Sequence, residues 1–438
     1  MTALRLRFTG SIAALSPEDR VALLDRSAAD DESIQFTVSS IIEIVRRDGD
    51  AALTALAREL DGVTLSSLEV PRAHCVQALE ALDPSVRAAL ERAHRNLSTV
   101  HRASIPRDVA VETESGVHVG LRAEAFHRVG IYAPGGRAAY PSSVLMGAVP
   151  ARIAGVREVV LCTPPGARGR PSPVTLAAAM LAGVDRVFAV GGAGAIAAMA
   201  YGTATIPRVD HIVGPGNAYV AEAKLQVARV VSTDAPAGPS ELLVIADDTA
   251  DPTGIAREML AQAEHDPNAR VLALLIGRGR EAALGRALSD RVDRYGRRTV
   301  IRRALADHGG ILTADDLDEA LVFAGDYAAE HVWLSVGEPQ ALLPRLRNAG
   351  AVFLGPESSV TFGDYLAGGN HVLPTGGLAR SYGALTTHDF VRWMSWQHVE
   401  PAAARRLAAD VARLAEAEGL DGHALAARAW DEAQETPE

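Results

Sequence analysis

A chain of 438 residues, 48% hydrophobic and 22% charged, is long enough for about two to four globular domains. Its formal net charge of −11, without a long basic run, argues against nucleic acid or an anionic membrane as a partner. The two cysteines, Cys75 and Cys162, exclude a disulfide framework and a thiolate-rich zinc site, and they indicate a reducing cytoplasm. Cys162 has no activating group nearby in the sequence, so we expect a buried structural thiol.

The first hundred residues are predicted to be mostly helical. In SPEDRVALLDRS, Ser16 offers an N-cap and Pro17 a first helical residue, and Asp83 with Pro84 repeats this start signal. The N-terminal stretch MTALRLRFTG lacks the apolar core of a signal peptide, and runs such as VLALLIG are too short to span a bilayer. These apolar runs predict buried strands instead.

Residues 130–240 show a repeated strand–turn–helix pattern, for example RVGIYAPGG followed by SSVLMGAVPARIAG. Such repetition predicts βαβ units and a mostly parallel sheet covered on both faces, and hence an α/β fold. Further strands are predicted at ELLVIADD, RVLALLIG, GGILTAD, AEHVWLSV and GAVFLG. From about Thr386 the chain is predicted to be helical again.

The segment DPTGIAREMLAQAEHDP predicts a helix that begins at Asp251 and stops near Asp266, before Pro267. Gln262 and His265 are three residues apart on or beside the buried face of this helix. Their side chains can therefore converge on one metal ion. The alternative is a partly solvated histidine near a helix C-terminus, where the helix dipole favours it.

Glu330 and His331 open the predicted strand HVWLSV. A glutamate and a histidine together suit general acid/base catalysis, because histidine titrates near neutral pH. Taken alone, a solvated strand end is the simpler explanation. The segment VTFGDYLAGGNHVLPTGG (360–377) adds Asp364 and His371 as candidate ligands or acid/base groups. A flexible surface loop is the alternative there, although the apolar residues in the segment favour docking on the core.

Two glycine-rich turns are candidate cofactor sites. VGPGNAYVAEAK (213–224) opens a helix after a strand, where free N–H groups can hold a phosphate. AVGGAGAIAAM contains Gly192-x-Gly194-x-x-Ala197 directly after a strand, which is the form of a dinucleotide-binding fingerprint. However, Asp210 begins the next strand, whereas a ribose-binding acid should end it. Tight helix–sheet packing is the competing explanation for these glycines.

Taken together, these segments resemble the histidinol dehydrogenase family over nearly the whole chain. The most specific stretch is PAGPSELLVIADDTADPTGIAREMLAQAEHD (236–266), and GIYAPGG, YPSSVLM, VGPGNAYV, AAEH and GDYLAGGNHVLPTGG occur in the family's order. The resemblance implies a zinc- and NAD-dependent cytoplasmic homodimer that oxidises L-histidinol to L-histidine in two steps, through an enzyme-held aldehyde. The implied zinc ligands are nitrogen and oxygen donors, namely Gln262, His265, Asp364 and His423.

The resemblance also implies roles for the other site residues. His331 would take the alcohol proton as hydride leaves for NAD, and Glu330 would activate the water that attacks the aldehyde. The implied substrate contacts are Ser240, His331, His371, Glu418 and the four zinc ligands, and the implied NAD contacts are Tyr132, Asn217 and position 194. The family usually has Gln where this chain has Gly194, so a side-chain hydrogen bond worth about 1 kcal/mol is missing. The stretch RWMSWQHV (392–399) also departs from the common family pattern.

The fold that the resemblance implies is two incomplete Rossmann-like parallel-sheet domains with helical ends. The expected parts are an N-terminal extension (1–28), a first Rossmann-like domain (29–130 plus 241–385), a second, NAD-contacting one (131–240), and a tail (386–438) that crosses to the partner subunit. Two alternatives for the function stay open. One is a related zinc- and NAD-dependent dehydrogenase for another polyol, such as a dihydroxypropane sulfonate, and the other is a metal- or ligand-binding protein without catalysis.

Overall fold

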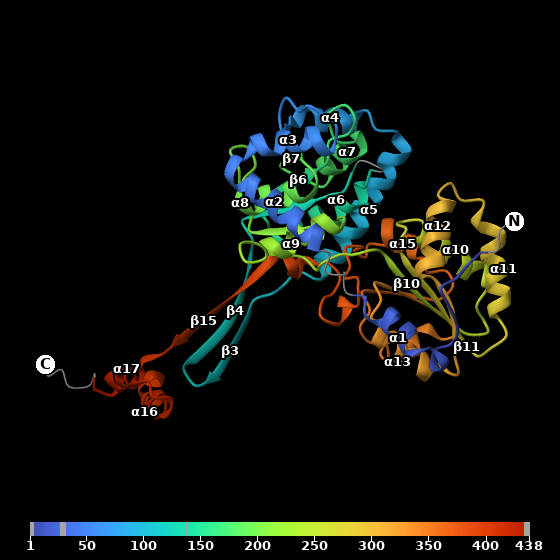
Figure 1. The fold of residues 1–438 in the computed structure, drawn as a ribbon. Helices are drawn as coiled ribbons and strands as arrows, with labels where there is room; N and C mark the ends of the chain where they lie inside the picture. The colour runs from blue at the N-terminus through green and yellow to red at the C-terminus, as the bar shows by residue number, and fades with distance from the viewer. Residues whose placement is uncertain (1–3, 27–31, 136–138, 433–438) are drawn as a thin grey trace. The chain divides into compact units, whose positions relative to one another are not determined.

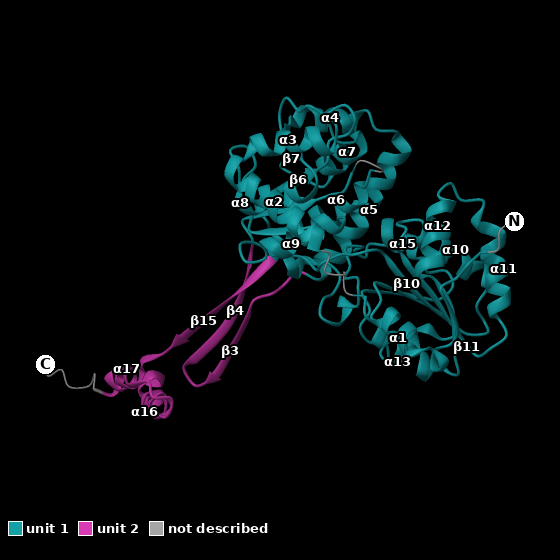
Figure 2. Ribbon diagram, in the orientation of Figure 1, with its two compact units in different colours: residues 1–104, 126–390 teal, residues 105–125, 391–438 magenta. Residues whose placement is uncertain are grey.

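The chain forms two compact units (Figure 2). Unit 1 comprises residues 1–104 and 126–390, and unit 2 comprises residues 105–125 and 391–438. The structure is a computed structural model that describes residues 4–26, 32–135 and 139–432. No helix in this described part of the chain is both long and apolar enough to cross a membrane.

The first sheet of unit 1, here called the β10 sheet, is parallel throughout (Figure 1). Its strands are β1 (Phe8–Ser11), β10 (Glu241–Ala246), β11 (Arg270–Ile276), β12 (Gly310–Ala314), β13 (His331–Ser335) and β14 (Ala351–Leu354), in the spatial order β1-β12-β11-β10-β13-β14. Alternate residues of β10 point to opposite faces, so Leu242 and Val244 join one apolar core while Leu243 and Ile245 join another. Both faces are therefore buried, as the continuous apolar run ELLVIA predicts.

Helices cover both faces of the β10 sheet (Figure 1). The core on one face includes residues of α10 (Pro252–Ala263), α11 (Glu281–Val292), α12 (Arg298–His308) and α15 (Val360–Tyr365). The core on the other face includes residues of η1 (Ile12–Ala14), α1 (Pro17–Leu24), α13 (Leu317–Tyr327) and α14 (Pro339–Leu342). The predicted start of α1 is confirmed, because the Ser16 hydroxyl accepts the N–H of Asp19.

The second sheet of unit 1, here called the β5 sheet, is parallel except for one edge strand. Its strands are β2 (Glu69–Val70), β5 (Arg128–Tyr132), β6 (Glu158–Thr163), β7 (Arg186–Ala189), β8 (His211–Val213) and β9 (Ser232–Thr233), in the order β2-β7-β6-β5-β8-β9. The chain passes outward from β5 through β6 to β7 and then returns to place β8 on the other side of β5. The direction of winding thus reverses between β5 and β8, which is the place where open α/β sheets bind ligands.

Eight helices in the described part of unit 1 pack with the β5 sheet. They are α2 (Glu32–Asp48), α3 (Asp50–Leu60), α4 (Arg72–Glu80), α5 (Pro84–Ala103), α6 (Pro141–Ala154), α7 (Pro173–Leu181), α8 (Gly192–Tyr201) and α9 (Ala218–Val227). Two short helices, η2 (Leu378–Arg380) and η3 (Thr387–Phe390), lie later in the chain. The α/β prediction with two parallel sheets is confirmed, and strands are present at each apolar run predicted between residues 130 and 354.

Two features of this packing differ from the sequence-based expectation. Side chains of α2, α3 and α5 share the core of the β5 sheet, although the expected division grouped residues 29–130 with 241–385. Residues 8–11 were expected to belong to a helical N-terminal extension (1–28), but they form strand β1 at the edge of the β10 sheet. An amphipathic helix buries its apolar face equally well on either sheet, so chain order does not reveal its partner. The four-part division itself stays a prediction.

Unit 2 contains an antiparallel sheet and a helix pair within its described residues. The elements are β3 (Val109–Glu114), β4 (Val117–Ala125), β15 (Val391–Val399), α16 (Pro401–Ala417) and α17 (Asp421–Glu432). Residues 391–399 were expected to belong to a helical tail, and that expectation is wrong, because they pair with β4 over its whole length. The Trp396 ring packs on the backbone of Gly120, where a Cβ atom would lie 2.4 Å from it. Aromatic and β-branched residues such as these favour strands.

Candidate active site

Glu330 and His331 lie at the amino end of β13, between β10 and the edge strand β14 of the β10 sheet. Both side chains are buried, and His331 is the first residue of the strand, as the sequence predicts. The neighbouring strand β10 begins at Glu241, and Leu242 is the register partner of His331. The pair therefore occupies the amino edge of a parallel sheet, whereas ligands of open α/β sheets usually bind at the carboxyl edge.

The main chain of Glu241 orients both side chains. The N–H of Glu241 donates to Oε2 of Glu330 over 2.7 Å, and Nδ1 of His331 donates to the carbonyl oxygen of Glu241 over 2.9 Å. A carbonyl oxygen can only accept, so Nδ1 must carry a proton and Nε2 is the ring nitrogen that can act as a base. Nε2 is buried and has no hydrogen-bond partner among the residues that the structure describes.

Two carboxylates flank the His331 ring. Oε2 of Glu330 lies 3.4 Å from Nδ1, and Oδ1 of Asp364 lies 3.7 Å from Nε2. Burial by itself lowers the pKa of His331, but the charges of Glu330 and Asp364 outweigh it and raise the pKa to about 10. Burial would raise the pKa of Asp364, yet the contact with His331 lowers it overall. At neutral pH this arrangement holds an imidazolium between two carboxylates.

Gln262 and His265 come from the end of α10, beside the same strands. Gln262 is buried, and its amide nitrogen lies 3.5 Å from Nδ1 of His331. The helix ends at Ala263, so His265 lies in the turn beyond it and not in the helix as expected. Nδ1 of His265 is 3.3 Å from Oγ of Ser240, the residue before β10. The contacts therefore join three of the expected substrate or metal residues to the amino edge of the β10 sheet.

Asp364 and His371 belong to a segment that docks on the protein. Asp364 is buried in α15, and its carbonyl oxygen accepts from Nδ1 of His371 over 2.8 Å. Nε2 of His371 lies 3.3 Å from Oγ of Ser143 in α6, and Nδ2 of Asn370 donates to the carbonyl oxygen of Met146. The prediction that residues 360–377 pack on the core is confirmed. Burial lowers the pKa of His371, which favours a neutral ring.

The donors gathered in unit 1 suit a zinc ion chemically. They are the Gln262 amide, the His265 imidazole and the Asp364 carboxylate, which are nitrogen and oxygen ligands. Within the described residues no group of three or more His, Cys, Asp or Glu side chains has the spacing of a metal site. The fourth expected ligand, His423, is in α17 of unit 2, and Glu418 ends α16 in the same unit.

The expected NAD contacts Tyr132 and Asn217 flank the switch point of the β5 sheet. Tyr132 ends β5, and its hydroxyl accepts the N–H of Gly192 over 3.2 Å. Asn217 caps α9 just after β8, where its side chain accepts the N–H of Val220 and is exposed. Carboxyl strand ends and a helix N-terminus meet here, which is the arrangement that binds dinucleotides.

A buried ion pair holds the turn after β8. Gly214 has φ +121°, and a Cβ atom there would lie 1.9 Å from the carbonyl oxygen of Tyr132, so only glycine fits. Asp234 accepts the N–H of Gly214 over 2.7 Å, and Lys224 donates to both Asp234 and the Gly214 carbonyl oxygen. Sequence reasoning missed Lys224 and Asp234. The only available signal was a lone lysine in the helix YVAEAKLQVA, which also carries Glu222 and Gln226.

Gly194 does not open onto the switch point. It lies in α8, and a Cβ atom there would meet Leu56 at 3.1 Å and Leu53 at 3.3 Å, both in α3. The glycine therefore allows α3 to approach α8 closely, which supports a packing role, here against a helix. A contact between position 194 and NAD stays a prediction.

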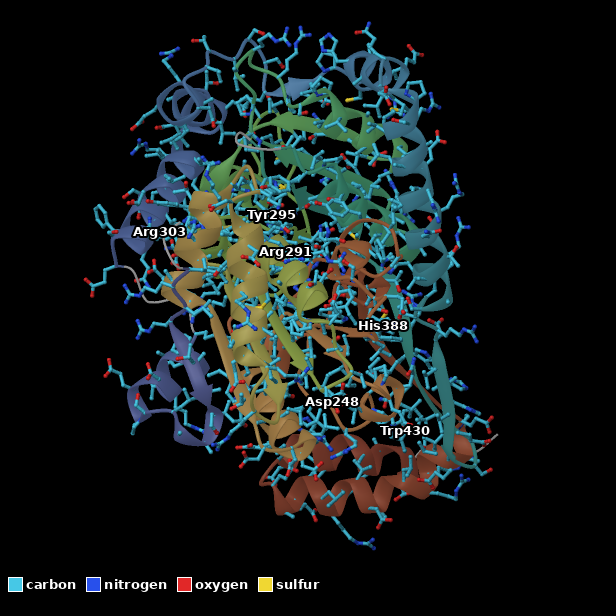
Figure 3. All side chains as sticks on the ribbon, turned by 90° about the vertical axis from the view of Figure 1, so that its right-hand side faces the viewer. Asp248, Arg291, Tyr295, Arg303, His388 and Trp430 are labelled. Atoms are coloured by element: carbon cyan, nitrogen blue, oxygen red, sulfur yellow. The ribbon has the colours of Figure 1, made fainter. Side chains whose placement is uncertain are left out.

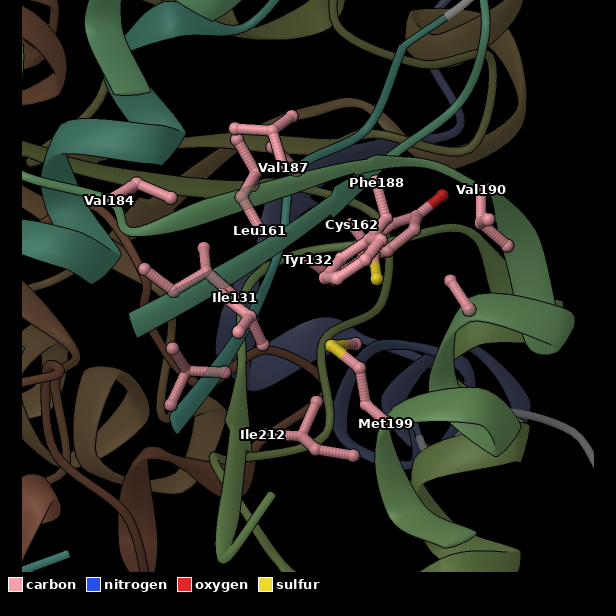
Figure 4. Packing of buried hydrophobic residues seen from close by; sticks show 14 of the residues in the cluster. Ile131, Tyr132, Leu161, Cys162, Val184, Val187, Phe188, Val190, Met199 and Ile212 are labelled. Carbon is pink, nitrogen blue, oxygen red and sulfur yellow. The ribbon is translucent and has the colours of Figure 1, made fainter. Parts of the chain in front are cut away.

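Cys162 has the structural role that the sequence predicts. It is fully buried in β6, and burial raises the pKa of its thiol. Figure 4 shows it beside Tyr132 and Phe188 in the core of the β5 sheet. A thiol held protonated in an apolar core is not a nucleophile.

Comparison with known proteins identifies the family. A family model described as histidinol dehydrogenase matches residues 24–430. The histidinol dehydrogenase of Halobacterium salinarum is 46% identical over 415 residues, which cover 94% of this chain and 97% of that protein. That of Parasynechococcus marenigrum is 45% identical over 397 residues, which cover 91% of each chain. The crystal structure of histidinol dehydrogenase from Elizabethkingia anophelis has a TM-score of 0.93 at 31% identity and covers 98% of this chain and 99% of that one. The chain therefore belongs to the histidinol dehydrogenase family and is an oxidoreductase.

Proposed function

We propose that the protein oxidises L-histidinol to L-histidine in cytoplasmic histidine biosynthesis, with Zn²⁺ and NAD, and keeps the aldehyde bound between two oxidations. The observation that supports this most is the buried Glu330–His331 pair, in contact with Gln262 and Asp364. A base, a second carboxylate and metal-type donors are thus gathered within one site of a chain from this family.

The zinc ligands in this proposal are Gln262, His265 and Asp364, with His423 from the tail. In the structure, the Gln262 amide nitrogen faces His331, which leaves the amide oxygen on the other side of the group. Zn²⁺, when bound, would hold nitrogen atoms of the substrate and so fix the alcohol carbon next to the catalytic residues. Ser240 lies against His265, where it can also contact the substrate.

His331 and Glu330 carry the proton transfers. Nε2 of His331 takes the alcohol proton in the first oxidation, and Glu330 takes a proton from the water that attacks the aldehyde in the second. NAD, when bound, accepts the hydride of each oxidation. Tyr132 and Asn217, at the switch point of the β5 sheet, are proposed to contact it.

Asp364 links metal binding to the protonation of His331. The imidazole holds its proton up to a pKa of about 10 in part because Asp364 faces Nε2. A cation on Asp364 would weaken that contribution and so would lower the pKa of His331, although Glu330 would continue to raise it. Asp364 would therefore serve both as a ligand and as the control on the base.

We also propose that the working form is a homodimer in which the tail of one subunit completes the site of the other. Unit 2 carries Glu418 and His423, and its two helices share only a small core of alanines. Leu414, Leu425 and Trp430 are 69%, 66% and 55% exposed, and Trp430 is labelled in Figure 3. Large apolar side chains exposed on such a small unit support burial against a second copy.

The decisive test combines a zinc assay with turnover. Purified protein is expected to contain zinc and to form two NADH for each L-histidinol consumed, with L-histidine as product. Removal of zinc by a chelator should abolish the activity, and added zinc should restore it. Zinc-loaded protein that forms no NADH with L-histidinol, but forms it with dihydroxypropane sulfonate, would assign the other polyol. Zinc-loaded protein without any dehydrogenase activity would favour a binding protein.

A further inference from the structure

A buried ion pair lies behind the two proposed acid/base residues. Arg26 and Glu241 are 215 positions apart in the sequence, and their side chains are 0% and 1% exposed. Nε of Arg26 is 2.8 Å from Oε1 of Glu241, and Nη2 is 3.2 Å from Oε2. This two-pronged contact is the strongest kind of hydrogen bonding that a carboxylate receives from a side chain.

Glu241 and Glu330 exchange hydrogen bonds across two strands. The N–H of Glu241 donates to the Glu330 carboxylate, and the N–H of Glu330 donates to Oε2 of Glu241 over 3.3 Å. The carbonyl oxygen of Glu241 accepts from Nδ1 of His331. Both proposed acid/base residues are therefore held by one residue, and its side chain is held in turn by Arg26.

The remaining polar atoms of the pair are also engaged. Nη1 of Arg26 donates to the Leu23 carbonyl oxygen over 3.0 Å, and the guanidinium lies 3.6 Å from the centre of the Tyr327 ring. Nη2 donates to the Tyr327 carbonyl oxygen as well. Oε1 of Glu241 accepts the N–H of Gly376 over 3.1 Å, which ties down the end of the segment that carries Asp364. The ion pair thus joins four distant parts of the chain, at residues 23–26, 241, 327 and 376, beside the amino edge of the β10 sheet.

We infer that Arg26 and Glu241 are positioning residues that fix the Glu330 carboxylate and the His331 ring for proton transfer. Burying the Glu241 carboxylate is costly unless a cation pairs with it. Arg26 supplies that cation, so Glu241 keeps its place and its main-chain N–H and C=O keep their directions. This inference rests on the proposed acid/base roles of Glu330 and His331.

The test is a double-mutant cycle between Glu241 and Glu330, measured as oxidation of L-histidinal by the zinc-loaded enzyme. Glu241→Gln keeps the shape of the side chain and removes one acceptor. It is expected to lower kcat about 10- to 100-fold, the size of effect that a small misplacement causes, while KM and zinc content stay within about twofold. In a Glu330→Gln background, the same substitution is expected to change kcat by less than about twofold.

Two further variants serve as controls, one for loss of folding and one for the removal of an ion pair elsewhere in the protein. Arg26→Met combined with Glu241→Gln removes both charges, which avoids leaving a lone buried ion. It should keep the thermal midpoint of the parent within a few degrees and yet show the kcat loss of Glu241→Gln. Glu69→Gln is the matched control, because Glu69 also makes a two-pronged pair with Arg186, at an edge of the β5 sheet. It should leave kcat unchanged.

The possible outcomes separate this inference from the proposed function. Equal kcat losses from Glu241→Gln in both backgrounds would mean that the pair is only structural, and the positioning role would be overturned. A Glu330→Gln enzyme as active as the parent would overturn the acid/base role of Glu330 and, with it, the inference. A large kcat loss only in the presence of Glu330 supports both.

Discussion

The pKa values of two buried histidines, His211 and His331, are shifted in opposite directions. Burial alone favours the neutral ring and lowers a histidine pKa. At His211, burial dominates, the charge of Lys224 adds to it, and the pKa falls to about 4. At His331, Glu330 and Asp364 outweigh burial, and the pKa rises to about 10. Burial thus lowers the pKa of both rings, and neighbouring carboxylates reverse the effect only at His331.

Because His211 is buried in its neutral form, we predict that the folded protein loses stability in acid. Its ring stacks on Phe126 at 5.3 Å, and its Nε2 is buried without a hydrogen-bond partner among the described residues. The unfolded chain binds this proton below about pH 6.5, but the folded chain binds it only below about pH 4. The contribution of His211 to the free energy of unfolding is therefore fully present above pH 6.5. It is lost as the pH falls toward 4, and the loss amounts to about 3 kcal/mol.

The measurement for His211 is the free energy of unfolding in urea, taken between pH 4 and 7.5. His211→Gln should be less stable than the parent at pH 7.5, and its stability should fall less steeply on acidification. Parallel pH profiles for the two proteins would show that His211 does not set the acid limit.

His331 and Glu330 should affect different oxidations. His331→Asn is expected to lower kcat for L-histidinol by about 10²- to 10⁴-fold, because it removes the base for the alcohol proton. Glu330→Gln should slow L-histidinal oxidation by a similar factor and allow the aldehyde to accumulate. Stopped-flow recording of the two NADH-forming steps separates them. Full activity of both variants would refute the acid/base assignment.

At the scale of single residues, the sequence indicates which polar residues are site candidates, but it does not indicate which residues they contact. Gln262 and His265 were visible as polar residues on a buried helix face, and Glu330 with His331 as a strand-opening pair. Arg26 and Glu241 were not found, because their pairing spans 215 positions and exists only after the β10 sheet forms. In the sequence, Glu241 is a single glutamate before an apolar run, which is common at the start of a strand.

At the scale of elements, the Gly214 turn is the part of the fold that most directly shapes the proposed NAD site. Both polar groups of Gly214 are fixed by Lys224 and Asp234, and its Cα approaches the Tyr132 backbone too closely for any side chain. A turn held by main-chain contacts of this kind presents free N–H groups in a fixed arrangement. Loosening the ion pair should therefore weaken cofactor binding.

Lys224→Met combined with Asp234→Asn is predicted to weaken NAD binding by about tenfold, which corresponds to about 1.4 kcal/mol. Removing both charges avoids a lone buried ion. NAD affinity is measured by calorimetry, with zinc content as a second readout that should not change. The control is Arg186→Met combined with Glu69→Gln, which removes the ion pair at the other edge of the same sheet. Unchanged NAD affinity in the Lys224 variant would show that the ion pair does not shape the site.

Helices and strands were predicted correctly where the pattern of apolar residues was clear. The prediction was wrong where it rested on amino-acid composition alone. The apolar runs of the two parallel sheets were recognisable, since strands buried on both faces are continuous apolar stretches. Residues 391–399 were predicted as helix because the chain beyond them is rich in alanine and arginine. Their pairing with β4, more than 260 positions earlier, decided otherwise.

At the scale of the whole molecule, the proposed crossing of the tail predicts complementation between inactive subunits. His265→Ala and His423→Ala should each lower zinc content and activity. If the tail completes the partner's site, a mixed dimer contains one intact site and one doubly mutated site. Random mixing in equal amounts should then restore about a quarter of the parent activity. No recovery after subunit exchange would show that each tail serves its own subunit.

Chain order explains why the fold class was predictable while the assignment of parts was not. Repeated strand–turn–helix units predict parallel sheets, but the pattern does not say which of the two sheets each unit joins. The helices α2, α3 and α5 precede β5, yet nothing in their apolar faces specifies the core that they share with it. The family resemblance supplied the candidate ligands, and the tertiary contacts supplied the network behind them.

The pairing of β4 with β15 has a consequence for synthesis of the chain. Residues 117–125 leave the ribosome more than 260 residues before the strand that covers one edge of β4, which lies at residues 391–399. Until then β4 has only the hairpin partner β3, and an uncovered strand edge can pair with another chain. The nascent protein therefore carries an open β-edge while the intervening residues are made, and β4 is paired on both edges only after residues 391–399 emerge.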